Sequence, residues 1–556
     1  MSAPDLATDR PRARGILTGL APLGLMLGTL FFAASLTPSL VPRPPLIQGA
    51  LGGFLFAAGY GLGVLLRAIW HWLELPAAPP AIRRSLRVVA VIGCALAAGL
   101  ALLWSAGWEN RLRALMDMEP IDNAGQITIA ATALAVFLVL VLLARLIGLS
   151  FRILNRSFHT RLPRRVALLV SVALTALLVW TVANGVLVAQ AMRVMDASYK
   201  AFDALFEPGS PQPTDPMKTG GPGSLLAWEG LGRAGREFIA AGPDRAKIEA
   251  VTGRPALEPL RVYAGLNSAA TLEERTRLVL DEMIRIGAFE RSTLVLITPT
   301  GTGWVDPQGQ YALEYLLGGD VASVAVQYSF LASWIALLSD SAYGLETARA
   351  VFATVYGYWR SLPPEERPTL YLNGLSLGAY NSDRSHDLFQ VIGDPYRGAL
   401  WSGPPFNSPT WQTATHGRDA GTPAWLPTFQ DGRVIRFMGP GGKHNSPADW
   451  GRYRVLYLQY ASDAIAFFDP ASIWRRPDWM TPPMGPDVSP EFRWIPVVTF
   501  FQLTFDLMFA VKPPMGHGHV YAFPDYVDAW ALLTDAPGWD AAALEALKTN
   551  PDARPQ

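Results

Sequence analysis

The sequence predicts a protein of two parts: an N-terminal all-α transmembrane bundle of about five helices and a C-terminal α/β domain with a mainly parallel sheet. Half of the 556 residues are hydrophobic and the mean hydropathy is positive, whereas a soluble protein of this length is usually more polar. Five long apolar runs lie before residue 190. From about residue 258, short β-rich runs alternate with amphipathic helical runs, which is typical of parallel strands joined by helical crossovers.

Each apolar run in the N-terminal part approaches or exceeds the roughly 20 residues that cross a bilayer core. The runs are Gly15–Leu36, Leu46–Leu66, Val88–Trp108, Ile127–Ala144 and Val166–Ala189. Glycine pairs in the first two runs are spaced four residues apart, as in Gly24/Gly28 and Gly59/Gly63, and such spacing lets helices approach closely. The sequence therefore predicts five transmembrane helices rather than the buried helices of a soluble core.

Positive charge is distributed unequally among the segments that connect these runs. Thirteen arginines lie in the N-terminal segment and in the second and fourth loops, against three in the first and third loops. Because cytoplasmic loops carry the excess of basic residues, the N-terminus is predicted to be cytoplasmic. Five crossings then put everything after residue 195 on the extracytoplasmic side.

Three segments are expected along the chain. Residues 1–195 are the transmembrane helical domain, 196–255 a linker and peripheral segment, and 256–556 the α/β domain. Residues 207–224 are rich in proline, glycine and serine, which is typical of a loop or linker. In the third segment, strands are predicted at 260–266, 292–300, 321–329, 369–374, 398–403 and 455–462, and helices at 271–287 and 345–362.

Composition excludes several classes of function. The formal net charge is zero, so no nucleic-acid partner is expected. Cys94 is the single cysteine, so the chain cannot form an internal disulfide, and a cysteine-based metal site is not expected. We expect no metal and no other cofactor.

One serine lies directly after a predicted strand. Residues 374–378 read Gly-Leu-Ser-Leu-Gly, which has the form G-x-S-x-G, and the segment after Ser376 can start a helix. A strand, a sharp turn and a helix are what a nucleophile elbow requires. The alternative is a serine in an ordinary turn, so the interpretation depends on finding a base, an acid and an oxyanion site elsewhere in the chain.

Backbone amides in two places are candidates for stabilising an oxyanion. In an elbow, the N–H of Leu377 is one donor. The second donor is expected from Thr300, Gly301 or Thr302, which follow the predicted strand ending near residue 297. Small residues there let backbone amides approach a substrate oxygen. A plain glycine-rich loop is the alternative interpretation of this stretch.

The acid and the base are expected after the serine in the chain. Asp463 directly follows the strand predicted at 455–462, where it would orient a histidine; it could also cap a helix that starts at residue 464, and both roles are compatible. The base is expected from His517 or His519, because Ser, Asp, His is the order for this chemistry on an open α/β sheet. His519 is favoured because it is nearer to the following helix. The spacing of the two histidines could instead suit a metal, but no third ligand with matching spacing stands out.

Residues 494–511 form a further apolar segment that could be a sixth span. A crossing there would put the histidine loop and Ser376 on opposite sides of the bilayer. Thr499, Gln502 and Asp506 fall on one helical face, so we interpret the segment as an amphipathic helix that packs on the domain or lies in the membrane interface.

These motifs together resemble the α/β-hydrolase superfamily. More narrowly, the chain resembles a bacterial integral-membrane α/β-hydrolase family, formerly a domain of unknown function, in which a multi-span N-terminal region precedes a hydrolase domain. The most specific stretches are GLSLGAY, TPTGTGW and GHGHVYAFPDYVDAW. The resemblance implies an α/β-hydrolase fold, a nucleophile at Ser376, a histidine from the GHGH loop and a bacterial cell-membrane location. The apolar segment between Asp463 and that loop departs from a simple hydrolase, which would have a last strand there.

The predicted function is that of a membrane-anchored serine hydrolase, esterase-like or lipase-like, that uses Ser376, Asp463 and one histidine. Its expected partners are membrane lipids and an acyl-ester or lipid-like substrate at the outer face of the membrane. An acyltransferase that forms the same acyl-enzyme is an alternative. A non-catalytic transporter or receptor is a second alternative, which is less favoured because the apolar runs hold few of the ionisable residues that transport sites usually need.

Overall fold

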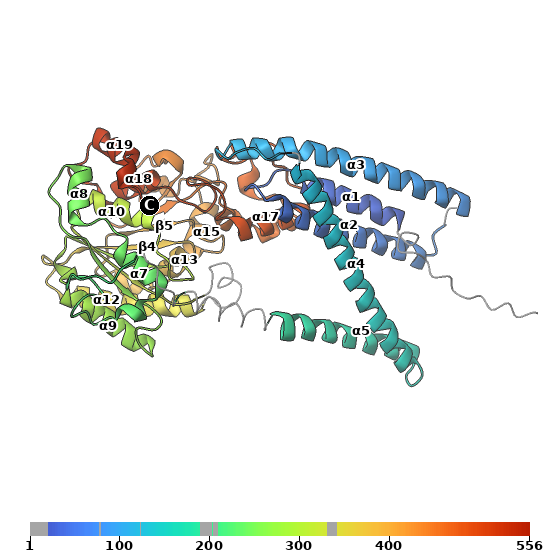
Figure 1. Ribbon diagram of the computed structural model, residues 1–556, viewed down its shortest axis with the longest axis horizontal. Coiled ribbons are helices and arrows are strands. Elements are labelled where there is room, and N and C mark those ends of the chain that lie inside the picture. Colours follow the sequence, from blue (N-terminus) through green and yellow to red (C-terminus); the bar gives the residue numbers. More distant parts are fainter. Residues whose placement is uncertain are drawn as a thin grey trace, which may run out of the picture.

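The computed structural model describes residues 21–76, 79–122, 124–188, 203, 210–330 and 342–555. The chain forms a helical part and an α/β part that lie end to end (Figure 1). The predicted fold class is confirmed, because N-terminal apolar helices precede a domain built on a parallel seven-stranded sheet.

The helical part contains long helices that follow the predicted apolar runs. They are α1 (Pro22–Ser35), α2 (Pro45–Trp72), α3 (Pro80–Ala114), α4 (Ala124–His159) and α5 (Arg164–Trp180). Among the described residues, four segments are long and apolar enough to cross a membrane: Pro45–Trp72, Ser85–Ala114, Gly125–His159 and Arg164–Gly185. The first predicted run begins at residue 15, and residues 15–20 lie outside the described part of the chain; the remainder forms the shorter apolar helix α1.

Glycines bring α1 and α2 into close contact. A Cβ atom on Gly63 would lie 2.5 Å from the Cα of Gly24, and one on Gly59 would lie 2.5 Å from the carbonyl oxygen of Leu27. Gly53 of α2 approaches α4 in the same way, because its Cβ would lie 2.4 Å from the carbonyl oxygen of Ala133. The four-residue glycine spacing in α2 therefore serves helix packing, as expected for apolar helices that pack without a hydrophobic driving force.

The α/β part is built on one sheet with strand order β1-β3-β2-β4-β5-β7-β6, in which each neighbouring pair is parallel. The strands are β1 (Leu260–Ala264), β2 (Thr293–Thr298), β3 (Val321–Val326), β4 (Thr369–Leu375), β5 (Gly398–Ser402), β6 (Ile435–Met438) and β7 (Arg454–Leu458). Six of them match the predicted runs, whereas the four-residue edge strand β6 was not predicted. β7 ends at Leu458 rather than near residue 462, so residues 459–462 separate it from Asp463.

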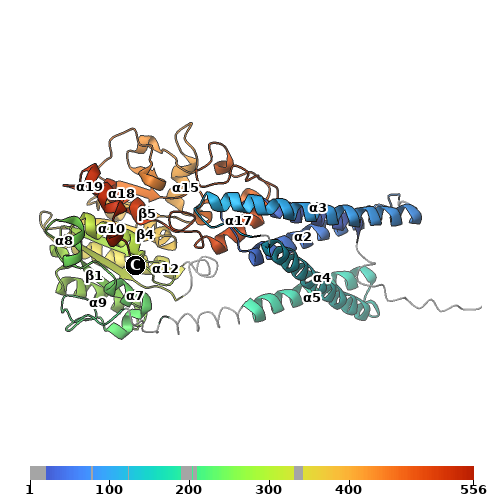
Figure 2. The same ribbon diagram turned by 45° about the horizontal axis from the view of Figure 1, so that its top comes forward.

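Helices cover both faces of the sheet (Figure 2). The helices of the α/β part are α7 (Gly232–Ala240), α8 (Arg245–Thr252), α9 (Leu272–Arg285), α10 (Pro307–Leu316), α12 (Ala342–Ser361), α13 (Leu377–Asp383), α14 (Leu388–Val391), α15 (Pro409–His416), α16 (Ala464–Phe467), α17 (Val498–Phe509), α18 (Phe523–Thr534) and α19 (Ala541–Thr549). Helices α10 and α18 pack on one face, and α9, α12 and α13 on the other. Helix α9 begins with a reciprocal capping box formed by Thr271 and Glu274.

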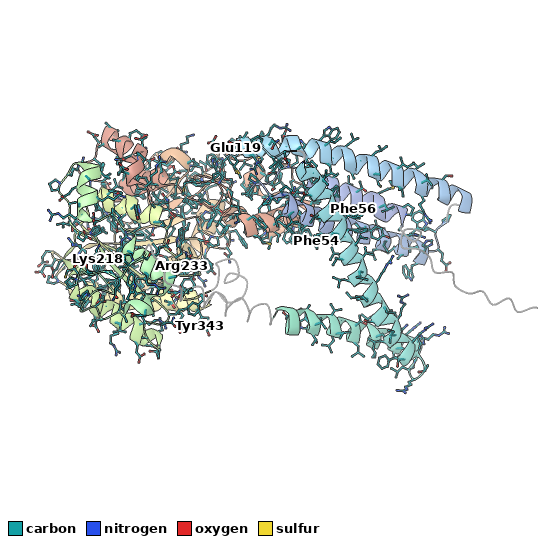
Figure 3. The ribbon with its side chains drawn as sticks, in the orientation of Figure 1. Phe54, Phe56, Glu119, Lys218, Arg233 and Tyr343 are labelled. Carbon is teal, nitrogen blue, oxygen red and sulfur yellow. The ribbon has the colours of Figure 1, made fainter. Side chains whose placement is uncertain are left out.

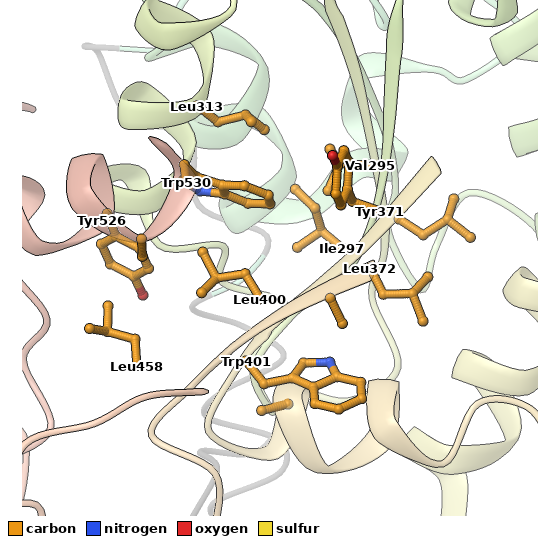
Figure 4. Packing of buried hydrophobic residues seen from close by; sticks show 14 of the residues in the cluster. Val295, Ile297, Leu313, Tyr371, Leu372, Leu400, Trp401, Leu458, Tyr526 and Trp530 are labelled. Carbon is orange, nitrogen blue, oxygen red and sulfur yellow. The ribbon is translucent and has the colours of Figure 1, made fainter. Parts of the chain in front are cut away.

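Alternating side chains of the central strands fill the core between these layers. In Figure 4, Tyr371 lies beside Trp530 of α18, with their ring centroids 6.2 Å apart. The next residue, Leu372, points to the opposite face, as does Trp401. Trp401 is 2 % exposed, and its indole N–H donates to the hydroxyl of Ser382 on α13 (3.0 Å). This packing holds the strand ends that carry the site in fixed positions.

The segment before β1 also joins this core. Leu226, Trp228, Leu231 and Ile248 are buried in the same hydrophobic cluster as the sheet. The described residues of the predicted peripheral segment therefore pack on the α/β domain.

Helix α17 joins the two parts of the protein. Asp506 on this helix accepts hydrogen bonds from Arg43 Nε (2.9 Å), the Ser39 hydroxyl (3.1 Å) and the Leu40 N–H (3.1 Å), which all belong to the loop between α1 and α2. Arg43 also donates to the Gln502 carbonyl (3.0 Å). The predicted polar face of this segment therefore exists, but it is buried against the helical part rather than exposed to water.

Apolar contacts surround this polar cluster. Val498 of α17 is fully buried against Leu51 and Leu55 of α2. The ring of Phe501 meets that of Phe54, which is labelled in Figure 3, edge to face with centroids 4.8 Å apart. The segment at 494–511 thus packs on both parts of the protein, and its helix of 12 residues is short for a span.

The connecting segments lie at two ends of the helical part. Arg43, in the first loop, and Arg111, near the end of α3, both pair with the α/β part, since Arg111 forms a bidentate ion pair with Glu491 (2.9 Å). The arginine-rich connections from α2 to α3 and from α4 to α5 lie at the end away from the sheet (Figure 1). The second and fourth loops therefore lie at the opposite end of the helices from Arg43 and Arg111, while Arg10, Arg12 and Arg14 of the N-terminal segment lie outside the described residues.

Candidate active site

Ser376 lies in a strained turn between β4 and α13. Its backbone angles are φ 58° and ψ −126°, a region that a residue with a side chain occupies only when the surrounding structure enforces it. The flanking glycines are required by packing. A Cβ on Gly374 would lie 2.4 Å from the carbonyl carbon of Gly378, and one on Gly378 would lie 2.1 Å from the carbonyl oxygen of Thr298. The segment therefore has the strand, the strained turn and the helix that a nucleophile elbow requires.

Substitution of Gly378 tests this packing. We expect Gly378→Ala to destabilise the protein by about 1–3 kcal/mol, because the added methyl group would meet the backbone of β2 and displace the turn. Gly357→Ala is the matched control, since a Cβ at this helical position has open space and alanine favours a helix by up to about 1 kcal/mol. Thermal unfolding of both variants in detergent measures the difference, and equal stability of the two would contradict the proposed packing.

Asp463 and His519 form a buried pair. Nδ1 of His519 lies 2.7 Å from Oδ2 of Asp463, and their side chains are 4 % and 0 % exposed. The Tyr521 hydroxyl donates to the same carboxylate oxygen (2.7 Å), while the other oxygen accepts from the Ile465 N–H (2.9 Å). Asp463 is therefore both the cap of α16 and the partner of the histidine, which are the two roles that the sequence left open.

A tight loop fixes the position of His519. Its backbone N–H donates to the Ala510 carbonyl (2.8 Å), and the N–H of Gly518 donates to the Ser462 hydroxyl (2.8 Å). Gly518 has φ 58°, and a Cβ there would lie 2.7 Å from a ring carbon of Pro513. The loop therefore requires glycine at this position, and it connects the histidine to the segment beside Asp463.

His517 has different surroundings. Its Nδ1 is buried without a hydrogen-bond partner among the described residues, and it lies near Asp487, which accepts a hydrogen bond from the Ser462 hydroxyl. His519 lines the cavity that holds Ser376, whereas His517 is not among the lining residues of that cavity. The geometry thus agrees with the preference for His519. No group of three His, Cys, Asp or Glu side chains within the described ranges could hold a metal ion.

The cavity has a volume of about 460 Å³ and opens at the carboxyl ends of β2 and β4. Its lining residues are Thr300, Thr302, Trp304, Asp306, Pro307, Gln308, Leu375, Ser376, Ile465, Leu507, Met508, Val511, Met515, His519, Val520 and Tyr521. Nε2 of His519 is buried, and no described residue hydrogen-bonds to it. The serine hydroxyl and the unpaired imidazole nitrogen therefore belong to residues that share one cavity, which suits proton transfer between them.

Of the predicted oxyanion residues, Thr300 and Thr302 line this cavity, whereas Gly301 and Leu377 are not among its lining residues. Leu377 is the first residue of α13, so its N–H has no partner within the helix. The N–H of Thr300 donates to the Trp304 carbonyl (3.0 Å), so it is already engaged inside the turn. Thr302 also lines the cavity, and its carbonyl accepts from Gln327 (3.2 Å). Leu377 and Thr302 thus suit the donor role better than Thr300.

Three features of the site were missed by the sequence analysis. Tyr521, two residues after His519 in the chain, donates to the Asp463 carboxylate. Gly403 leaves room for the pair, because a Cβ there would lie 2.6 Å from Cε1 of His519. Asp306 lines the cavity and caps α10 by accepting from the Gln308 N–H (3.0 Å). Burial raises the pKa of Asp306 to about 6, against the opposing effects of that hydrogen bond, Tyr526 and the charge of His519.

Comparison with known families agrees with this geometry. Residues 260–547 match the model of an alpha/beta-hydrolase family, and residues 36–243 match the model of the N-terminus of the same family. The chain belongs to this alpha/beta-hydrolase family. Family membership supports a hydrolase-type function, and the four apolar helices indicate that the hydrolase is a membrane protein. No curated protein and no solved structure matches the hydrolase.

Proposed function

We propose that the hydrolase is a serine hydrolase that cleaves carboxylic esters through an acyl-enzyme. The observation that carries the proposal is the buried His519–Asp463 pair, whose free imidazole nitrogen belongs to the same cavity as the strained Ser376. A serine alone is a weak nucleophile, and a positioned base that is itself oriented by a carboxylate activates it.

In the proposed reaction, Nε2 of His519 takes the proton of the Ser376 hydroxyl as the oxygen attacks the ester carbonyl. Asp463 holds Nδ1–H, so the imidazole keeps Nε2 as the acceptor and its positive charge is stabilised. The N–H of Leu377, with a second amide near Thr302, stabilises the oxyanion, each donor contributing about 3 kcal/mol. His519 then gives the proton to the leaving alcohol, and water releases the acyl group by the reverse sequence.

We further propose that the α/β domain works on the extracytoplasmic side of a bacterial cell membrane, on an acyl ester that resembles a lipid. The arginine-rich connections lie at the opposite end of the helices from the sheet, and such connections are usually cytoplasmic. One wall of the cavity consists of apolar side chains from and beyond α17, which suits an acyl chain better than a polar substrate.

Labelling with a fluorophosphonate probe tests the nucleophile. The wild-type protein is expected to be labelled, and Ser376→Ala is expected to lose the label completely, because the probe reacts only with an activated serine. Ser361→Ala is the control, since Ser361 is exposed at the end of α12. Labelling of Ser376→Ala at the wild-type level would remove the proposal. In the same experiment, a membrane-impermeant probe applied to intact cells reports on which side of the membrane Ser376 lies.

A further inference from the structure

The cavity has two chemically different walls. Thr302, Trp304 and Asp306 come from the segment after β2 and carry polar groups. Leu507, Met508, Val511 and Met515 come from the end of α17 and the segment after it, and they carry only apolar side chains. Ser376 lines the cavity together with both sets, so an ester at the serine would have both polar groups and hydrocarbon within the same cavity.

The apolar wall continues to the surface of the protein. Met508, Val511 and Met515 are 47 %, 62 % and 50 % exposed. Exposed apolar side chains that are contiguous with a reactive cavity mark a ligand-binding surface more often than singly scattered ones do. Unbranched methionines adapt to irregular apolar partners at low cost. A flexible hydrocarbon chain is the ligand that such a rim would bind.

The position of the rim follows from the contacts of α17. The helix is held to the loop before α2 by the Arg43–Asp506 pair (2.7 Å), and to α2 itself by Val498. The membrane-capable helix α2 and the cavity wall are therefore connected through one short helix, which keeps the mouth of the cavity beside the membrane-capable helices.

We propose that Leu507, Met508, Val511 and Met515 form an acyl-chain subsite that receives the hydrocarbon chain of a membrane lipid ester, with the ester carbonyl at Ser376. This inference rests on the proposed function and adds the residues that bind the acyl chain of its substrate. Transfer of hydrocarbon from water to this wall makes longer acyl chains better substrates, by about four-fold in kcat/KM for each methylene group that is buried.

A chain-length series tests the subsite in the full-length protein in nanodiscs. We expect kcat/KM for p-nitrophenyl esters to rise from acetate to dodecanoate. Met508→Gln and, separately, Val511→Gln are each expected to lower the dodecanoate-to-acetate ratio by about ten-fold, because each places a polar group on the wall. Met217→Gln is the control, since Met217 is similarly exposed (43 %) and does not line the cavity; its ratio should equal that of the wild type.

Photocross-linking gives a second readout that does not depend on turnover. A phosphatidylcholine with a diazirine near the end of one acyl chain, in the same nanodiscs, should label the peptide that contains residues 507–515. Cross-links confined to α2–α5 would overturn the subsite, and so would a wild-type dodecanoate-to-acetate ratio in both wall variants. The proposed function would still be supported in either case if the protein hydrolysed the acetate ester. If no ester is hydrolysed and Ser376 is not labelled by the fluorophosphonate, both proposals fall.

Discussion

Replacement of Asp463 by asparagine is expected to lower kcat/KM for ester hydrolysis by about 10³- to 10⁴-fold while the protein stays folded. Oδ2 of Asp463 accepts from Nδ1 of His519, which leaves Nε2 free to accept the serine proton. An asparagine amide at this position would donate to Nδ1 instead, so Nε2 would carry the proton. The histidine would then be held in the wrong tautomer for a general base.

The second oxygen of Asp463 makes this substitution interpretable. Oδ1 accepts from the Ile465 N–H (2.9 Å) and caps α16, and the side-chain oxygen of asparagine caps a helix about as well. The Tyr521 hydroxyl also loses its carboxylate acceptor in this variant, so a large loss of activity with a melting temperature close to that of Tyr521→Phe would report the tautomer and not unfolding. Near wild-type hydrolysis by Asp463→Asn would contradict the assigned role.

Tyr521→Phe is the control for the surroundings of the pair. It removes one hydrogen bond to Asp463 (2.7 Å) but leaves the carboxylate and the histidine in place. Loss of one buried hydrogen bond costs about 1–3 kcal/mol, so the stability of this variant should fall while it keeps much more activity than Asp463→Asn. Steady-state rates with p-nitrophenyl acetate, with melting temperatures of all three proteins, separate the two effects.

Much of this site could be predicted from the sequence because its parts have local signals. Ser376 lies between two glycines after a β-rich run, and His519 lies in a loop that needs glycine at 516 and 518 for positive φ angles. Parallel strands end at the same edge of a sheet, so the order of Ser376, Asp463 and His519 along the chain predicted that they would converge.

The missed elements lack such local signals. Strand β6 has four residues, too few to show a period. Gly403 matters because its absent side chain leaves space for residues far along the chain, and no sequence pattern reports that space. Asp306 was missed because a single carboxylate before a proline indicates a helix cap, which it also is; its place in the cavity is a property of the folded sheet.

The joint between Arg43 and Asp506 is the clearest case of a feature that one sequence cannot predict. The polar face of α17 was visible from the spacing of Thr499, Gln502 and Asp506. Its partner lies 463 positions away in the chain, at the edge of a loop with no distinctive motif. Only the folded structure shows that this face is turned toward the helical part.

Substitution of this buried pair is expected to have the largest effect on stability. Arg43 and Asp506 are 3 % and 0 % exposed, and removal of one member of a buried pair typically costs about 3–5 kcal/mol, because the other charge stays buried without a partner. Asp506→Leu should therefore lower the melting temperature in detergent strongly. It should also reduce hydrolysis of long-chain esters, since α17 carries the apolar wall of the cavity.

The two single variants, Arg43→Met and Asp506→Leu, should not lose the same amount of stability. Burial raises the pKa of Asp506, and the charge of Arg43 and the hydrogen bonds from Ser39 and Leu40 oppose that effect. In Arg43→Met, the carboxyl group can therefore take up a proton and avoid a buried charge. In Asp506→Leu, the guanidinium of Arg43 cannot lose its proton in the same way. We expect Asp506→Leu to be the more destabilising change.

The double variant Arg43→Met/Asp506→Leu completes the thermodynamic cycle. With neither charge present, no unpaired charge is left at this joint, and the double variant should regain much of the stability lost in Asp506→Leu, because well-packed apolar replacements of buried ion pairs are often neutral. The exposed pair Arg111–Glu491 joins the same two parts of the protein, with side chains 57 % and 39 % exposed. Glu491→Gln should cost less than about 1 kcal/mol. Equal losses of stability at both joints would contradict this argument. They would show that the burial of Asp506 does not determine how firmly α17 holds the cavity wall against the helical part.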